Sequence, residues 1–462
     1  MTVSYHRTPL TYGSQTVDEF IPTKMRRVRV LEVSEYRPDF KDFLKKLNEV
    51  LTHPLNMKPF DDMVRELYVE GKKIVILVDD NTRPNIHTRA ILPPLTARMM
   101  KLGVRKSDIK IMVASGSHGR VKPEAVQGKV LKELYEEWKD NVITHDADSG
   151  NRLVGETSRG TPILIDEQVL DSCLVIVLSD SEYHYFAGQA GTVKLFCPGI
   201  AGRETIRVNH PRMFDLEKGF VDGCRLGNTV GNPVIEDMIE IVQKMQQRLN
   251  IFCIDTIIDR GKIVYVQAGD IIACHKAAAP LLRRLRVVDV DEPADIVVVS
   301  VGELGINLYQ AGKGIHAAWN AVRHDRKGWI ILLARCEDGI GSAAFEEAMM
   351  ATKDMSVKDA LKYVIQTYCS QKTFKIGNQK PPDLFRILLD VAEGDVKVLT
   401  ELDPKTLRSV YRLEGVSPNV PGGPQAALRG LFERWVKEHP DNPDPLIYVL
   451  GDSGLLVNVK KR

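Results

Sequence analysis

The chain has 462 residues, of which 44% are hydrophobic and 27% charged, with a formal net charge of +2. This near-neutral balance gives no support for nucleic-acid binding, no apolar run reaches the roughly 18–20 residues that cross a bilayer, and the N-terminus lacks a signal-peptide core. We therefore expect a cytoplasmic protein with neither nucleic-acid nor membrane partners, and its length predicts two domains because single cores seldom exceed about 250–300 residues.

The first half of the chain alternates apolar, β-branched runs with helical stretches. Continuous apolar runs indicate strands that are buried on both faces, as in a parallel sheet covered by helices. We expect strands at residues 72–80, 108–116, 174–180 and 251–259, and helices near 88–102 and 123–137.

A second series of the same kind begins near residue 294, with strands at 294–302 and 328–336 and a helix near 310–324. We therefore predict an α/β protein of two α/β domains with mostly parallel sheets and an active site in the interdomain cleft. We place the N-terminal domain at residues 1–285 and the C-terminal domain at residues 286–442. The last segment indicates a strand, a glycine turn and a strand, and we expect residues 443–462 to pack back on the N-terminal domain.

Polar side chains follow the first two predicted strands, where ligands gather in such sheets. Asp80 and Arg83 follow the first strand, and the guanidinium of Arg83 is suited to bidentate binding of a carboxylate. An Asx-type turn with a surface arginine is the alternative, and this motif alone favours it. His118 follows the second strand on a loop of small residues, where it is either a proton-transfer group or an ordinary loop donor.

The third strand is followed by His184 and then by a glycine-rich stretch that leads to Lys194. A second histidine at an equivalent strand end indicates a two-base site, as a racemase needs when one group acts on each face of a stereocentre. Lys194 is interpreted as a phosphate-binding charge or a nucleophile, with a generic anion contact as the alternative.

His210 precedes a proline, which disfavours helical geometry at the histidine and is expected to expose the imidazole. A single histidine is a poor zinc site, so a metal here would take its other ligands from outside the protein. In the second domain Tyr309, Gln310 and Lys313 lie at a predicted helix start. Gln310 and Lys313 share a helix face and favour an anionic ligand, and a solvated helix end is the alternative.

In order and spacing these motifs resemble the nickel-dependent lactate racemase family, the racemases and epimerases of 2-hydroxy acids that carry a nickel-pincer nucleotide. Ten positions separate His184 from Lys194 and sixteen separate Lys194 from His210. The matching segments are Asp80-Asn81-Thr82-Arg83-Pro84, Gly116-Ser117-His118, His184 with Ala187-Gly188, Lys194 with Pro198-Gly199, Asn209-His210 and Tyr309-Gln310-Ala311-Gly312-Lys313.

The resemblance implies an isomerase that inverts C2 of a 2-hydroxy acid. Lys194 would carry the nucleotide covalently, and His210 would bind its nickel, for which a square-planar site is suitable. His118 and His184 would handle the hydroxyl proton on opposite sides of the substrate while the cofactor takes and returns hydride. The implied substrate-binding residues are Asp80, Arg83, Tyr309, Gln310, Lys313 and Tyr368. Thus the N-terminal domain would bind the cofactor, which cofactor-synthesis proteins would supply transiently, and the C-terminal domain would contribute substrate-binding residues.

The chain departs from the family pattern at two places. Gly191-Thr192-Val193 stands where Gly-Gly-Arg is expected, so Arg203 or Arg207 would have to supply a cation near the nucleotide phosphate. Tyr368 takes the place of a tryptophan, which favours a bulkier or more polar 2-hydroxy acid than lactate.

Two other functions remain open from the residues, and assembly into a homo-oligomer is open as well. A nicotinamide-dependent 2-hydroxyacid dehydrogenase would use the same histidines, but no GxGxxG follows a strand. A non-catalytic nickel- or nucleotide-binding protein would use Lys194 and His210, and it leaves Arg83, His118 and Gln310 without a role.

Overall fold

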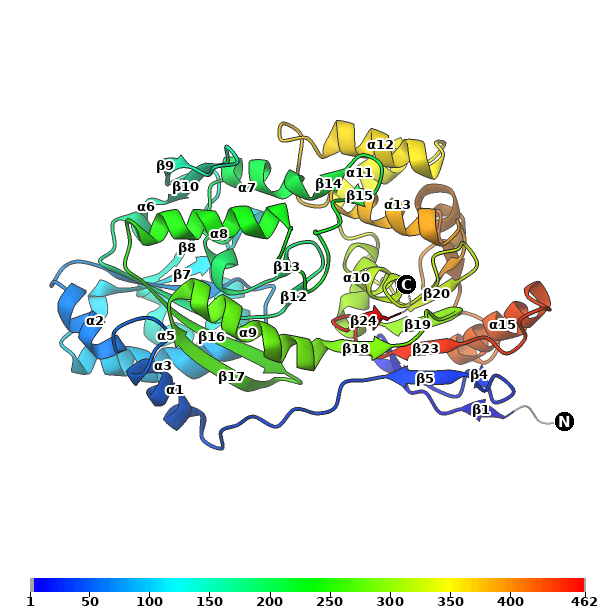
Figure 1. Cartoon of the computed structure of the whole chain (residues 1–462), viewed down its shortest axis with the longest axis horizontal. Coiled ribbons are helices and arrows are strands. Elements are labelled where there is room, and N and C mark those ends of the chain that lie inside the picture. The colour runs from blue at the N-terminus through cyan, green and yellow to red at the C-terminus, as the bar shows by residue number, and fades with distance from the viewer. Residues whose placement is uncertain (1–3, 461–462) are drawn as a thin grey trace. The chain divides into compact units, whose positions relative to one another are not determined.

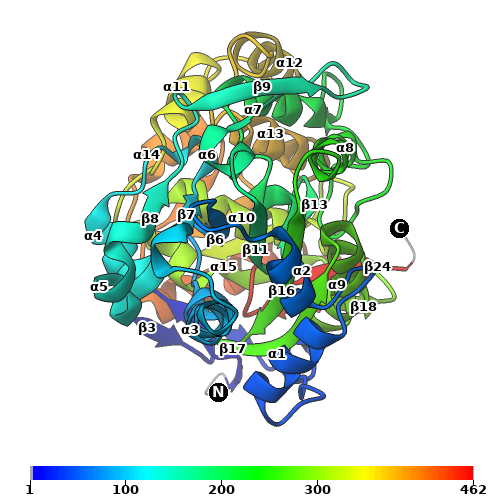
Figure 2. The same cartoon turned by 90° about the vertical axis from the view of Figure 1, so that its left-hand side faces the viewer.

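The computed structural model describes residues 4–460 and divides into two compact α/β units (Figures 1 and 2). The central unit, named for its position in the sequence, consists of Glu35–Met213 and Gly223–Leu285. The terminal unit consists of the residues up to Ser34, the short segment Phe214–Asp222 and the residues from Arg286 onward. None of the described helices is both long and apolar enough to span a membrane.

A six-stranded sheet forms the middle of the central unit, in the order β17-β16-β11-β6-β7-β8. All neighbouring strands are parallel except β16 and β17, which are antiparallel. The four strands expected from apolar runs are confirmed, because such runs are buried on both faces. The strands are β6 (Ile74–Asp79), β7 (Ile109–Ala114), β8 (Val142–Thr144), β11 (Leu174–Asp180), β16 (Ile251–Asp259) and β17 (Lys262–Gly269).

Helices α1, α2 and α3 pack their apolar residues against one face of this sheet. The helix expected near 123–137 is broken into short turns, with a positive φ of 48° at Lys132. The helices are α1 (Phe43–Thr52), α2 (Phe60–Leu67), α3 (Ile86–Lys101), α4 (Pro123–Ala125), α5 (Tyr135–Trp138), α6 (Glu167–Leu170), α7 (Arg203–Asn209), α8 (Pro233–Gln246) and α9 (Ile271–Arg286). Two hairpins complete the unit, β9 (Asn151–Glu156) with β10 (Pro162–Asp166) and β12 (Tyr183–His184) with β13 (Gly188–Gln189).

The terminal unit is built on a second six-stranded sheet, in the order β22-β21-β20-β19-β23-β5, and all its strands are parallel. Its strands are β5 (Val28–Leu31), β19 (Ile296–Ser300), β20 (Trp329–Leu333), β21 (Val396–Leu399), β22 (Glu414–Val416) and β23 (Ile447–Leu450). Apolar residues of α10 to α13 cover one face and those of α15 cover the other. The helices are α10 (Leu308–Trp319), α11 (Ala343–Ala351), α12 (Val357–Tyr368), α13 (Lys380–Asp390), α14 (Pro404–Thr406) and α15 (Gly423–Glu438).

Short strand pairs complete the terminal unit. The pairs are β1 (Tyr5–His6) with β4 (Ile21–Pro22), β2 (Leu10–Tyr12) with β3 (Gln15–Val17), β14 (Phe214–Asp215) with β15 (Gly219–Phe220), and β18 (Val287–Val290) with β24 (Leu456–Val459).

The expected domain boundaries need a correction at both ends of the chain. The division between Leu285 and Arg286 falls where the sequence analysis put it. However, the expectation that residues 443–462 belong with the N-terminal domain is wrong for the described part of this segment, because β23 lies between β19 and β5 in the terminal sheet and β24 pairs with β18. Residues up to Ser34 also belong to the terminal unit rather than to a domain 1–285. An apolar run reveals that a strand is buried on both faces, whereas its neighbours are fixed only by tertiary packing.

Candidate active site

Asp80 forms hydrogen bonds both within its own turn and to His118. One carboxylate oxygen accepts hydrogen bonds from the backbone N–H and the hydroxyl of Thr82, and the Asp80 carbonyl accepts one from the Asn85 amide, so the expected Asx-type turn is present. The other oxygen lies 2.8 Å from His118 Nδ1. Burial opposes the charge of Asp80, but the hydrogen bonds from His118 and Thr82 outweigh it and hold the carboxyl pKa below its usual value.

His118 stands on a loop whose backbone is tightly held. The N–H of Gly116 donates to the carbonyl of Gly199 at 2.9 Å, and Gly116 has a φ of 54°. A Cβ at this position would lie 3.0 Å from the Pro198 carbonyl oxygen, so glycine is needed here for both conformation and space. The His118 side chain itself is 54% exposed. The loop thus fixes the position of an imidazole that a ligand can reach.

Arg83 forms an ion pair with Glu182, a residue that the sequence analysis did not single out. The negative charge of Glu182, which outweighs the effect of burial, raises the pKa of Arg83. The ion pair uses the Nη1 donor, and a guanidinium has five N–H donors in a planar fork. Glu182 therefore sets the orientation of Arg83, and a substrate carboxylate would have to share the guanidinium with it.

His184 ends the short strand β12 and is surrounded by aromatic rings. The backbone N–H of Ala187 donates to His184 Nδ1 at 3.3 Å. The imidazole stacks on Tyr185 with 5.2 Å between ring centroids and meets Phe186 edge to face at 4.4 Å. His184 thus has a backbone partner where His118 has a carboxylate.

Phe186 is the residue that connects the predicted site, and sequence reasoning missed it. Its ring is 4% exposed and contacts His184, lies 5.5 Å from the ring of His210, and has Lys194 Nζ 5.7 Å from its centroid. The segment around it was recognised by its histidine and glycines, and an apolar side chain gave no chemical signal. Three predicted functional side chains, His184, Lys194 and His210, therefore share one aromatic neighbour.

The turn before Lys194 is fixed by a buried polar network. Gly191 has a φ of 81°, and a Cβ on it would lie 2.8 Å from the Asp180 carbonyl oxygen. The next residue, Thr192, has a φ of 41°, a conformation that is strained for a threonine. Its N–H donates to Ser179 Oγ and its hydroxyl lies 2.7 Å from His275 Nδ1. These bonds stabilise a conformation that the glycine of the family pattern would adopt without strain.

A buried carboxyl completes this network behind the turn. Asp255 is fully buried and accepts hydrogen bonds from the hydroxyls of Ser179 and Ser181, both at 2.8 Å. Burial raises the pKa of Asp255 to about 7. Because Ser179 also contacts Thr192, the network runs from strand β16 to the turn that places Lys194.

His210 is buried rather than exposed. It is 3% exposed and continues α7 with helical φ and ψ angles, so the expectation drawn from the following proline was wrong. Asn209 donates through Nδ2 to Asp237 at 2.8 Å, which leaves its Oδ1 to accept from His210 Nδ1 at 3.1 Å. Burial, together with the nearby charges of Lys194 and His118, lowers the His210 pKa to about 3. The imidazole is therefore neutral, with its lone pair at Nε2.

A metal at His210 would need ligands from outside the protein. Among the residues that the structure describes, no group of three or more His, Cys, Asp or Glu side chains could hold a metal ion. Of the two arginines proposed to replace a missing cation, Arg203 is engaged by Asp148 through two hydrogen bonds and Arg207 lies 3.2 Å from Glu204. Their role near a phosphate stays a prediction.

In the terminal unit, three of the predicted substrate-binding residues lie in the first turns of helix α10, namely Tyr309, Gln310 and Lys313. The side chain of Asn307 caps this helix by accepting from the backbone N–H of Gln310 at 3.0 Å. Tyr309 and Lys313 are four residues apart and lie on one face, which is only partly buried. The helix start was thus correctly located by sequence, whereas its Asn307 cap is a finding of the structure.

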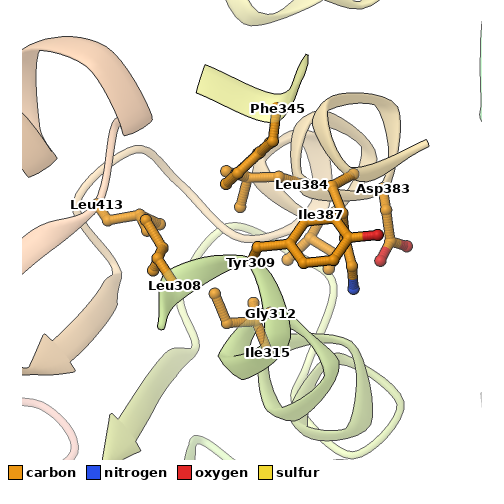
Figure 3. Close-up of a pocket in the computed structure, with 10 residues that line it drawn as sticks. Leu308, Tyr309, Gly312, Ile315, Phe345, Asp383, Leu384, Ile387 and Leu413 are labelled. Carbon is orange, nitrogen blue, oxygen red and sulfur yellow. The ribbon is translucent and has the colours of Figure 1, made fainter. Parts of the chain in front are cut away.

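Two further polar residues lie beside Tyr309, and the sequence analysis missed both. Gln379 Nε2 donates to the Tyr309 hydroxyl oxygen at 3.1 Å, and Lys380 Nζ lies 5.9 Å from the centre of the Tyr309 ring. Tyr309, Lys380 and Asp383 line a small cavity with apolar neighbours that include Phe345 (Figure 3). Tyr368 instead has its ring 6.3 Å from that of Tyr363. The role of Tyr368 in substrate binding stays a prediction.

Comparisons with known proteins show which family the chain is similar to. Residues 12–220 match the lactate racemase N-terminal domain and residues 290–402 match the lactate racemase C-terminal domain. The chain is 30% identical over 320 residues to a lactate racemase of Thermoanaerobacterium thermosaccharolyticum, which covers 68% of this chain and 70% of that relative. It is 29% identical over 355 residues to a lactate racemase of Lactiplantibacillus plantarum, which covers 76% of this chain and 79% of that relative.

The fold shows the same similarity. The structure of the lactate racemase apoprotein from T. thermosaccharolyticum aligns with a TM-score of 0.79 at 26% identity, over 98% of this chain and 100% of that one. A protein from Thermotoga maritima aligns with a TM-score of 0.61 at 16% identity, over 92% and 100%, which is a similarity of fold alone. The sequence and fold together show that the chain belongs to the lactate racemase family.

Proposed function

We propose that this protein is an isomerase that inverts C2 of a 2-hydroxy acid, and that it uses a nickel-pincer nucleotide attached to Lys194. One observation carries the proposal: Lys194 and His210 contact the same buried ring, Phe186, which also contacts the candidate base His184. The family membership supports the isomerase activity. The substrate we propose is more polar or bulkier than lactate.

The residues present are suited to holding such a cofactor. His210 is buried and donates its Nδ1 proton to Asn209, so Nε2 is the nitrogen with the lone pair that a metal requires. Lys194 stands on a turn fixed by Thr192 and by Gly191, which suits a residue that carries a covalent group. When bound, the nucleotide would accept the α-hydrogen of the substrate as hydride and return it.

The chain's own residues would bind the substrate and handle one proton. His118 and His184 would each take the proton of the 2-hydroxyl from one enantiomer and return a proton to form the other. Arg83, together with Gln310 and Lys313, would bind the substrate carboxylate. Asp80 would stabilise the positive charge that His118 acquires, through the 2.8 Å contact to Nδ1.

The test requires protein that is produced together with the cofactor-synthesis enzymes, because an ordinary host could leave Lys194 bare. Peptide mapping by mass spectrometry should find an adduct on Lys194 with about one nickel per chain, and chiral chromatography should detect inversion of at least one 2-hydroxy acid. Lys194→Arg is the matched control, which should carry no adduct. An unmodified Lys194 under these conditions would contradict the proposal. If lactate were the best of a panel with malate, 2-hydroxyglutarate and aldonates, the proposed polarity of the substrate would be wrong.

A further inference from the structure

The residues beside Tyr309 carry an inference that goes beyond the family. Gln379 is 5% exposed and its amide orientation is fixed by its partners. Its Oε1 accepts from the backbone N–H of Gly377 at 2.8 Å, and a backbone N–H can only donate. Its Nε2 must therefore be the group that donates to Tyr309 Oη at 3.1 Å.

This arrangement decides what the Tyr309 hydroxyl can do. Its oxygen accepts from Gln379, so its own proton points elsewhere and is a donor for a ligand. Two prolines, Pro381 and Pro382, occupy the first turn of α13 and restrict the backbone directly after Gln379 and Lys380. Gln379 thus acts as a rigid positioning residue for Tyr309.

Lys380 places a positive charge next to the same hydroxyl-bearing ring. It is 5% exposed, and its Nζ lies 3.6 Å from the position that a Cβ on Gly312 would occupy. Gly312 precedes Lys313, so the Lys380 ammonium rests against the stretch of α10 that carries Tyr309 and Lys313. The nearby cavity has a volume of about 20 Å³, room for about one water molecule, and Tyr309 and Asp383 are among its polar walls (Figure 3).

The charges around Lys380 favour an incoming anion. Asp383 is engaged by His316 at 2.9 Å and by Arg386 at 2.7 Å. Burial lowers the pKa of Lys380 to about 8, with Asp383 opposing this shift and Lys313 and Arg386 adding to it. A carboxylate next to Lys380 would stabilise its charged form.

We propose that Gln379 and Lys380 determine substrate specificity: Gln379 positions the Tyr309 hydroxyl as a donor, and Lys380 recognises a second acidic group on the substrate. The favoured substrates are then 2-hydroxy dicarboxylic acids. This inference rests on the proposed function, because it concerns which 2-hydroxy acid is inverted.

The test of Lys380 uses holoenzyme with a verified Lys194 adduct, and malate and lactate as probes. The wild-type protein should have a kcat/KM for malate at least about 10-fold above that for lactate. Lys380→Met should raise the KM for malate about 10-fold or more while changing lactate kinetics by less than about 3-fold, and Lys380→Arg should restore part of the preference. If Lys380→Met does not fold, Lys380→Gln takes its place in the same measurement. Lys375→Met, which removes an exposed lysine from the turn that precedes α13, is the matched control and should leave the ratio unchanged.

The test of Gln379 is a double-mutant cycle with Tyr309. Gln379→Leu should lower kcat for both substrates by about 3–10-fold, and it should have little further effect in the Tyr309→Phe background, because the bond that it breaks is already absent. An equal effect in both backgrounds would overturn the positioning role. A malate-to-lactate ratio that Lys380→Met leaves unchanged would overturn the recognition role.

Calorimetric binding of malate and lactate separates this inference from the proposed function. If loaded protein binds malate through Lys380 but inverts no 2-hydroxy acid, the proposed function fails and the recognition role stands. If inversion occurs without any dependence of malate binding or turnover on Lys380, the specificity inference fails and the proposed function stands.

Discussion

The two candidate bases, His118 and His184, follow strands β7 and β11 of the same sheet but have opposite surroundings. His118 is half-exposed and its Nδ1 contacts the buried carboxylate of Asp80 at 2.8 Å. His184 is packed against Tyr185 and Phe186, and its Nδ1 faces the backbone N–H of Ala187 at 3.3 Å. One ring therefore has an acceptor at Nδ1 and the other has a donor.

This difference assigns opposite tautomers to the two neutral rings. Because an ionised carboxylate only accepts, His118 carries its proton on Nδ1 and has its lone pair at Nε2. Because a backbone N–H only donates, the neutral form of His184 carries its proton on Nε2. A positive charge on His118 is stabilised by Asp80, whereas protonation of His184 would cost the bond from Ala187. In the proposed reaction, His118 would therefore take up a proton at Nε2, whereas His184 would take one up at Nδ1 only by giving up the bond from Ala187.

The largest expected effect is the loss of inversion when either candidate base is replaced. Either His118→Asn or His184→Asn should lower steady-state inversion by about 10²–10⁴-fold, because a full cycle needs both groups. In a single turnover, each variant should still oxidise one enantiomer to the 2-keto acid, and the surviving enantiomer should differ between the two variants. Rapid-quench chromatography measures this, with nickel content and the Lys194 adduct expected to be unchanged. His53→Asn, at an exposed position, is the control. Loss of the same enantiomer in both variants would contradict opposite-sided action.

A smaller effect is expected when the partner of His118 is changed. Asp80→Asn removes the charge that selects the Nδ1–H tautomer, so inversion should fall by at least about 100-fold, toward the roughly 10⁴-fold loss seen when an aspartate behind a catalytic histidine is changed to asparagine. Single-turnover oxidation should be impaired for the enantiomer that depends on His118 and largely retained for the other. Equal impairment of both enantiomers would show that Asp80 supports the fold of the site rather than His118.

Replacing the aromatic neighbour of His184 should have a more modest effect. Phe186→Leu removes edge-to-face contacts, each worth about 0.5–1.5 kcal/mol, so we expect about a 10-fold loss of kcat with a partial loss of bound nickel. Steady-state kinetics and metal analysis measure both. Phe43→Leu, which changes a partly buried ring packed against the core of the same unit, is the control. Retained kcat and nickel in Phe186→Leu would show that the ring only fills space.

The smallest effect concerns stability and pH. The pKa of Asp80 is held below its usual value near 3.8, so its ionised form contributes stability that is present above that value and is lost as pH falls through the folded-state pKa. The difference in free energy of unfolding between the wild-type protein and Asp80→Asn should therefore be constant near neutrality and shrink in acid. Urea unfolding from pH 7 to 3 measures it. If the difference in free energy of unfolding grew on acidification, the pKa of Asp80 would not be lowered by folding.

Sequence alone singled out most of the candidate residues, because residues of suitable chemistry follow strands that are recognisable from the sequence. His118, His184 and Lys194 follow buried apolar strands, and such strands are recognisable from continuous apolar runs. The N-terminus of α10 was found for a similar reason, since its residues come directly after a predicted buried strand, and the structure adds that Asn307 caps it. Phe186, Gln379 and Lys380 were missed because an isolated apolar, amide or lysine side chain carries no pattern that reveals what it contacts.

The sequence by itself determined the α/β class, the two series of parallel strands and the motifs by which the chain resembles its family. Only the tertiary structure decided that β23 and β5 complete the sheet of the terminal unit, because strand pairing depends on packing between distant segments. It also decided that His210 is buried, contrary to the local effect of Pro211, since packing overrides a local backbone preference. The hydrogen-bond partners of His118 and His184 were also decided only by the tertiary structure, because Asp80 is distant from His118 along the chain.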